Sequence, residues 1–131
     1  MALPPIRVLI ADDDPRFRQV IRSLLDAEDD MDVVAEASDG EEAIALTSEH
    51  APNVVLMDIR MPKLSGLDAA LVLDDIHPSA KVVMLTISDD PSDLFEAIRS
   101  GASGYLLKDT AADGVADAIT PATTPTPEPG K

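Results

Sequence analysis

Polar side chains stand directly after four apolar runs of the chain, at the points where buried strands would end. Three aspartates follow the first run and a single aspartate follows the third, while the fourth run ends on a threonine and a lysine follows the fifth. In chain order these residues are Asp12, Asp13, Asp14, Asp58, Thr86 and Lys108. Carboxylates, a hydroxyl and an amine are groups that bind a hard cation and the oxygens of a phosphate.

The residue types narrow the chemistry that such a site could perform. Carboxylates gathered within a few ångströms repel one another, a cost that a bound cation removes. Magnesium suits the set, because it prefers octahedral oxygen coordination and binds through one or two carboxylates together with phosphate oxygens. The chain has no cysteine, and no serine–histidine pair or glycine-rich loop adjoins these strand ends, so a carboxylate is the best candidate nucleophile. Asp58 stands alone after its run, and an aspartyl phosphate is a known product of carboxylate catalysis.

The elements that must position these residues follow a regular alternation of strands and helices. The apolar runs are nearly continuous, which is typical of parallel strands covered on both faces. We predict strands at Ile6–Ala11, Met31–Ala37, Val54–Met57, Lys81–Thr86 and Gly104–Leu107. Helices are predicted to begin at Pro15, at Ser38 and Asp39, near Leu67, and at Asp89 to Pro91, with a weak fifth helix at 113–119.

This alternation predicts an α/β fold with a five-stranded parallel sheet, of the flavodoxin-like doubly wound (βα)5 type. Right-handed crossovers favour the strand order 2-1-3-4-5. In that order the first, third, fourth and fifth strands are neighbours, so their carboxyl ends meet at one crevice. We therefore expect the acids, the threonine and the lysine to converge there. Asp14 has a second interpretation, because beside Pro15 it is expected to cap the first helix.

Apolar residues at helical spacing predict which helix faces are buried. For the first helix these residues are Phe17, Val20, Ile21, Leu24 and Leu25. The first helix is therefore expected to be amphipathic. The fourth helix carries the apolar residues Leu94, Phe95 and Ile98.

Length and composition limit the class of protein. At roughly 100–200 residues per domain, 131 residues allow one domain, which we place at residues 1–120. Residues 121–131 are rich in proline and threonine without periodic apolar positions, which predicts a flexible tail or linker. The formal charge of -15 disfavours direct contact with nucleic acid or anionic lipid. Neither a signal peptide nor a membrane span is evident, and the lack of cysteine fits a cytoplasmic protein.

Two local sequences match a known family. Val-Leu-Met-Asp-Ile-Arg-Met-Pro at 55–62 and Gly-Ala-Ser-Gly-Tyr-Leu-Leu-Lys-Asp at 101–109 resemble the receiver domain of two-component response regulators, most closely the NarL/FixJ (LuxR-like) type. The resemblance covers about residues 5–119 and rests on five separated motifs in order. It implies a phosphorylation-controlled signalling switch with transcription control as its output, rather than an enzyme that turns over a separate substrate.

The resemblance also implies how phosphate and metal would be bound. Asp58 would accept the phosphoryl group from a sensor histidine kinase. Asp13, Asp58 and the main-chain carbonyl of Arg60 would bind Mg²⁺ directly, and Asp12 would assist through water. Mg²⁺ is thus the expected cofactor.

Further residues would carry the phosphorylation state outward. By resemblance, Thr86 and Lys108 would contact the phosphoryl oxygens, and Tyr105 would be an aromatic rotamer switch coupled to Thr86. The surface of the fourth helix, fifth strand and fifth helix would bind a partner or form a homodimer. Receivers of this type normally precede a helix-turn-helix domain, and that domain, rather than the receiver itself, would contact DNA.

Two alternatives stay open at the level of sequence. Asp12-Asp13-Asp14 fits the Asp-x-Asp pattern of haloacid-dehalogenase-like phosphatases, which use an aspartate nucleophile, here Asp12, and magnesium. Against this, Arg16 stands where that class usually has a hydroxyl or aliphatic residue, and the chain lacks length for a cap domain. The other alternative, a pseudo-receiver that binds partners without phosphorylation, is disfavoured because every required site residue is present.

Overall fold

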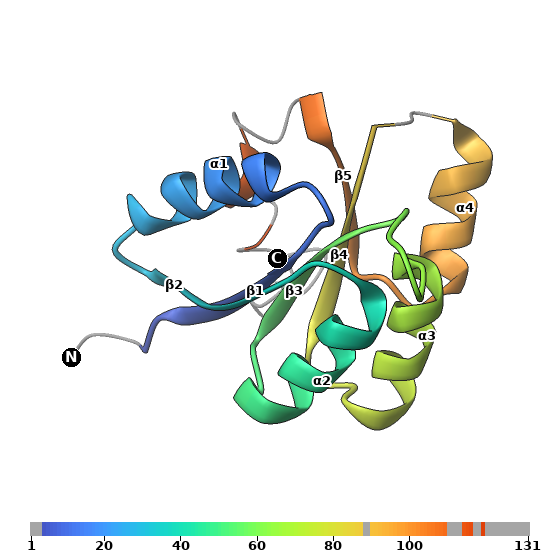
Figure 1. Cartoon of the computed structure of the whole chain (residues 1–131), viewed down its shortest axis with the longest axis horizontal. Helices are drawn as coiled ribbons and strands as arrows, with labels where there is room; N and C mark the ends of the chain where they lie inside the picture. The colour runs from blue at the N-terminus through green and yellow to red at the C-terminus, as the bar shows by residue number, and fades with distance from the viewer. Residues whose placement is uncertain (1–3, 88–89, 110–113, 117–118, 120–131) are drawn as a thin grey trace, which may run out of the picture.

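The β-sheet brings the four strand ends side by side. The computed structural model describes residues 4–87, 90–109, 114–116 and 119, and its five parallel strands pair in the order β2-β1-β3-β4-β5 (Figure 1). The strands are β1 (Ile6–Ala11), β2 (Met31–Ala37), β3 (Val54–Asp58), β4 (Lys81–Thr86) and β5 (Gly104–Leu107). The predicted fold class and strand order are confirmed, and β3 runs one residue further than predicted, so that Asp58 is its last residue.

The strand register aligns the carboxyl ends at one edge of the sheet. Ala11 pairs with Met57 across β1 and β3. Asp58 pairs with Leu85 across β3 and β4, and the last residues of β4 and β5 also pair with each other. Residues that follow these ends therefore emerge next to one another, as the predicted topology requires.

Each helix between the strands begins at a capping side chain. The helices are α1 (Pro15–Asp26), α2 (Gly40–His50), α3 (Gly66–Ile76) and α4 (Pro91–Arg99). Their caps are Asp14, Asp39, Ser65 and Asp90, whose side chains accept backbone N–H groups of the first turn. The cap of α4 is thus Asp90, whereas the sequence suggested Asp89. Residues 114–116 and 119 are helical, and the rest of the predicted fifth helix, like residues 121–131, lies outside the described residues.

Successive strand residues supply two apolar cores, one on each face of the sheet. Val8, Ile10 and Leu56 belong to the core on the α1 side, together with Val115 and Ile119. The alternate strand residues pack in the other core, against side chains from α2, α3 and α4. Figure 1 shows α1 on one side of the sheet and α2 and α3 on the other. The three central strands β1, β3 and β4 are therefore largely buried on both faces, which explains their nearly continuous apolar sequences.

The large apolar side chains of α4 are exposed. The buried side chain of this helix is Ala97. The larger apolar residues Leu94, Phe95 and Ile98 are 40%, 59% and 63% exposed. The helix approaches the sheet through its small residue, so the large ones lie toward solvent. Of the helices within the described ranges, none has both the length and the apolar character needed to cross a membrane.

Candidate functional site

The three aspartates after β1 lie in different environments. Asp12 is fully buried, whereas Asp13 and Asp14 are exposed. The Asp14 carboxylate accepts the N–H of Arg16 at 3.0 Å, and the N–H of Asp14 donates to Asp12 Oδ1 at 2.9 Å. The predicted helix-capping role of Asp14 is thus confirmed, and Asp12 and Asp13 are left facing the crevice.

Asp58 completes a group of three carboxylates at the strand ends. It is the last residue of β3, and its side chain is 11% exposed. One oxygen each from Asp12, Asp13 and Asp58 lie within 4.8 Å of one another. The structure therefore brings Asp58 together with two carboxylates that lie 46 and 45 positions before it in the sequence, as the order of the strands predicted.

A lysine from the end of β5 lies between two of these carboxylates. The Lys108 Nζ atom is 2.6 Å from Asp12 Oδ2 and 3.2 Å from Asp58 Oδ2. Its side chain is 15% exposed, so the ion pairs are largely removed from solvent. This geometry fixes the ammonium directly beside the carboxylate of Asp58.

Burial and neighbouring charges shift the pKa values of both partners. Burial, followed by repulsion from Asp12, raises the pKa of the Asp58 carboxyl above its ordinary value, although Lys108 and the Arg60 N–H oppose this. For Lys108, burial alone lowers the pKa, but the Asp12 and Asp58 carboxylates outweigh it and the net direction is upward. The amine therefore keeps its charge. The ionised form of Asp58 is destabilised by its surroundings, and an added positive charge would stabilise it.

Thr86 and Tyr105 share one face of the sheet near this crevice. Thr86 is buried at the end of β4, next to Leu85, whose backbone pairs with Asp58. Tyr105 is half-buried on β5 and pairs with Met84, two residues before Thr86. Because side chains alternate along a strand, Thr86 and Tyr105 point to the same face. Their coupling as a switch stays a prediction.

Two glycines hold the loop that follows Asp58 at close range. A Cβ atom at Gly66 would lie 2.0 Å from the carbonyl oxygen of Asp58, and one at Gly40 would lie 2.2 Å from that of Leu64. Hydrogen bonds accompany both approaches: the Gly66 N–H donates to Ile59 O at 2.8 Å, and the Gly40 N–H donates to Leu64 O at 3.1 Å. The loop is thus fixed by the first residues of α2 and α3. In it, the Arg60 N–H donates to Asp58 Oδ1 at 3.4 Å, and the predicted role of the Arg60 carbonyl stays a prediction.

Phe17 is a site neighbour that sequence reasoning assigned only to the core. Its ring centroid lies 4.6 Å from the Lys108 Nζ atom, and the partly buried side chain also packs against the core on the α1 side. The sequence contained one indication of this contact. Aromatic residues are rare in the chain, which has two phenylalanines, one tyrosine and no tryptophan, and one of these few closely follows the acidic run.

The donor set fits a hard divalent cation. Within the described part of the chain, Asp12 Oδ2 is buried and receives no hydrogen bond of good geometry, although the Lys108 ammonium is close. Three carboxylates within reach of one point supply the oxygen ligands that Mg²⁺ prefers. A bound cation would also offset the effects of burial and of repulsion from Asp12, which together raise the pKa of Asp58.

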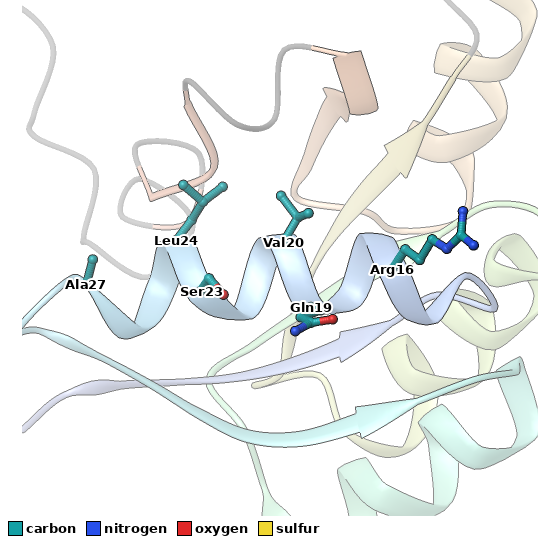
Figure 2. A pocket seen from close by; sticks show the side chains of 6 residues that line it. All are labelled: Arg16, Gln19, Val20, Ser23, Leu24 and Ala27. Carbon is teal, nitrogen blue, oxygen red and sulfur yellow. The ribbon is translucent and has the colours of Figure 1, made fainter.

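A separate shallow groove runs along the outer face of α1. Its volume is about 560 Å³, and it shares no residue with the acidic cluster. Figure 2 shows the side chains that line it, which are Arg16, Gln19, Val20, Ser23, Leu24 and Ala27. Val20 was predicted to be buried but is 49% exposed in this groove, because α1 meets the sheet through Ile21 and Leu25.

Comparison with known proteins agrees with this geometry. Residues 8–120 match the response regulator receiver domain. The chain belongs to this family. The receiver domain is 46% identical over 114 residues to the transcriptional regulatory protein YxjL of Bacillus subtilis (strain 168), covering 87% of this chain and 52% of YxjL. It is 42% identical over 115 residues to the nitrate/nitrite response regulator protein NarP of Escherichia coli (strain K12), covering 88% of this chain and 54% of NarP.

Solved receiver structures superpose closely on this one. The signal receiver domain of NarL from Mycobacterium tuberculosis matches with a TM-score of 0.88 at 31% sequence identity, covering 92% of this chain and 98% of that one. The response regulator domain of CheB from Thermotoga maritima gives a TM-score of 0.86 at 30% identity, covering 94% and 99%. The receiver domain spans about half the length of the curated relatives it matches. It is a signalling module of the two-component type; of those relatives, YxjL is named a transcriptional regulatory protein and NarP a response regulator.

Proposed function

We propose that Asp58 is the phosphoacceptor of this receiver domain and that a sensor histidine kinase supplies the phosphoryl group. One observation carries the proposal: the Lys108 ammonium is held between Asp12 and Asp58, at 2.6 and 3.2 Å, in a buried crevice at the strand ends. A carboxylate beside a fixed cation is placed to receive a group that brings negative charge with it.

The chain's own residues account for most of the transfer step. An Asp58 carboxylate oxygen attacks phosphorus in line and forms a new O–P bond, while the P–N bond to the donor imidazole breaks. The electron pair of that bond returns to the imidazole nitrogen, and a proton already on the other ring nitrogen of the donor leaves a neutral histidine on the kinase. Lys108 neutralises charge on the phosphoryl oxygens, and the Thr86 hydroxyl donates a hydrogen bond to them.

Mg²⁺ is the cofactor that we propose for this site. Asp12, Asp13, Asp58 and the main-chain carbonyl of Arg60 would hold it. When bound, it supplies positive charge that offsets both the carboxylates and the incoming phosphoryl oxygens. The buried Asp12 Oδ2, which lacks a hydrogen bond of good geometry among the described residues, supports this assignment.

The structural change caused by phosphorylation would be transmitted from the site through β4 and β5. We propose that Thr86 moves toward the phosphoryl group, that Tyr105 changes rotamer with it, and that the surface of α4, β5 and the following helix binds a partner or a second copy. Residues 1–120 would form the receiver domain, and 121–131 would link it to an output domain that controls transcription. That output domain, and not the acidic receiver, would contact DNA.

Intact-mass analysis tests the phosphoacceptor directly. The protein is incubated with Mg²⁺ and acetyl phosphate, and a gain of one phosphoryl group is expected. Asp58→Asn should abolish the gain. The same change at Asp75, on the exposed face of α3, should leave it intact. An unmodified wild type, or an Asp58→Asn variant labelled at the same rate, would refute the proposal.

The phosphatase alternative has less support from the geometry. The Asp-x-Asp pattern needs the carboxylates of Asp12 and Asp14 at one centre, but Asp14 accepts the Arg16 N–H as the cap of α1. Turnover of a phosphate ester that Asp12→Asn abolishes and Asp58→Asn does not would favour the phosphatase after all.

A further inference from the structure

We propose that Phe17 is a positioning residue for phosphoryl transfer, which holds the Lys108 ammonium at the site through the face of its ring. The inference rests on the proposed phosphoacceptor role of Asp58. The distance of 4.6 Å from the Lys108 Nζ atom to the ring centroid lies within the range of a cation–π interaction. Phe17 thus provides a third contact for an amine that otherwise depends on two carboxylates.

The two phenylalanines of the chain show why this contact differs from a surface pair. Phe95 also faces a cation, but Arg99 lies 5.8 Å from its centroid and has a side chain 67% exposed. Lys108 is only 15% exposed. A cation–π interaction strengthens when the cation is removed from water, so the contact of Phe17 is the stronger of the two.

The backbone that carries Phe17 is tied to the acidic cluster. The Asp14 N–H donates to Asp12 Oδ1 at 2.9 Å, and the Asp14 carboxylate and carbonyl cap the first turn of α1. The Arg18 guanidinium, from the residue after Phe17, donates to the carbonyl of Asp12. The ring is therefore held in register with Asp12 by contacts on both sides of it.

The ring has a property that the carboxylates lack. Asp12 and Asp58 hold Lys108 by charge, and both are also the proposed ligands of a cation that would compete for their oxygens. Phosphorylation in addition converts an Asp58 oxygen into part of a mixed anhydride. The ring neither titrates nor binds Mg²⁺, so its attraction for the ammonium persists through these changes. Phe17 would keep the amine beside Asp58 while its ionic partners are engaged elsewhere.

Phosphorylation rates of matched variants test the role. With saturating Mg²⁺ and acetyl phosphate, Phe17→Leu should slow labelling of Asp58 by about three- to tenfold, because it removes the π face but keeps an apolar side chain. Phe17→Tyr restores the ring and should recover most of the rate. Leu71→Ala, which truncates an exposed apolar side chain on α3, should label like the wild type.

A double-mutant cycle separates positioning from general damage to the fold. In a Lys108→Gln background, Phe17→Leu should cause no further loss of rate, because its partner is already gone. In NMR spectra of the wild type, the Lys108 methylene protons next to the amine should show an upfield ring-current shift, which Phe17→Leu removes and Phe17→Tyr keeps. Circular dichroism melting curves establish that each variant is folded.

The outcomes distinguish this inference from the function on which it rests. A wild type that is labelled at Asp58, with Phe17→Leu equally fast or equally slowed in both backgrounds, would overturn the role of Phe17 and leave the phosphoacceptor intact. A wild type that is not labelled would overturn both. Loss of rate that the tyrosine recovers and that vanishes in the Lys108→Gln background would support the inference.

Discussion

The contact between Gly66 and the backbone of Asp58 makes Gly66→Ala a sensitive probe of the site. The added Cβ would lie 2.0 Å from the Asp58 carbonyl oxygen, whereas contacts under 3.0 Å are essentially never observed. The start of α3 and the end of β3 must therefore separate by at least about 1 Å. Displacement of a reacting group by about 1 Å can cost on the order of 100-fold in rate. We expect Gly66→Ala to slow phosphorylation of Asp58 by about that factor.

The assay compares initial rates with acetyl phosphate at saturating Mg²⁺, read by intact mass, with urea unfolding measured in parallel. Overpacking of this kind should also lower the free energy of unfolding by about 1–3 kcal/mol. Gly114→Ala is the matched control, because no heavy atom lies within 4 Å of the added Cβ. It should leave the rate unchanged and, in a helix, slightly raise stability.

The result that would refute this reasoning is specific. If Gly66→Ala is folded and phosphorylated at nearly the wild-type rate, then the position of the Asp58 backbone relative to α3 does not limit the reaction. A large loss of rate in Gly114→Ala would equally contradict the argument, because a Cβ added there meets no heavy atom within 4 Å.

Three further predictions concern stability. Because burial, and then Asp12, raise the pKa of Asp58, wild-type stability without Mg²⁺ should fall as the pH rises from the ordinary value of 3.8 through the raised value. Asp58→Asn should remove this loss, so that its free energy of unfolding at neutral pH exceeds that of the wild type by about 1 kcal/mol. Urea titrations of both proteins from pH 4 to 8 measure the difference, and equal stability of the two across that range would contradict the prediction. Asp39→Ala removes the cap that accepts the Glu42 N–H at 2.8 Å and the ion pair with Lys63 at 3.7 Å. It should cost about 1 kcal/mol in thermal unfolding, and no change in melting temperature would argue against the cap. On α3, Leu73→Ala at a fully buried site should lower the free energy of unfolding by about 2–5 kcal/mol. Leu71→Ala at a 52% exposed site should change it by no more than about 0.5 kcal/mol. Similar losses in urea unfolding of the two variants would mean that burial does not determine the cost.

Strand order and strand ends could be predicted because they depend on local patterns. Continuous apolar runs indicate parallel strands, and a polar residue after each run marks its end. Burial of the helices was less predictable, as Val20 of α1 shows. Its spacing indicates an amphipathic helix, but the side of the apolar stripe that meets the sheet depends on packing between segments far apart in sequence.

The same distinction applies to the site. Convergence of Asp12, Asp58 and Lys108 followed from the topology and is observed. The contact of Phe17 with Lys108 joins residues 91 positions apart in the sequence and depends on how α1 lies across the sheet. No local pattern encodes such a distance, so the spacing of Phe17 indicated only a core position.

The close approach of Gly40 to the loop after Asp58 has a consequence for how this chain can diverge. Every amino acid other than glycine carries a β-carbon, and at Gly40 that atom would lie 2.2 Å from the carbonyl oxygen of Leu64. Every amino-acid substitution at this position therefore meets the same collision, whatever the rest of the side chain is. Variation at the start of α2 is therefore possible only if the path of the Leu64 backbone changes at the same time, and that backbone belongs to the loop beside the phosphoacceptor.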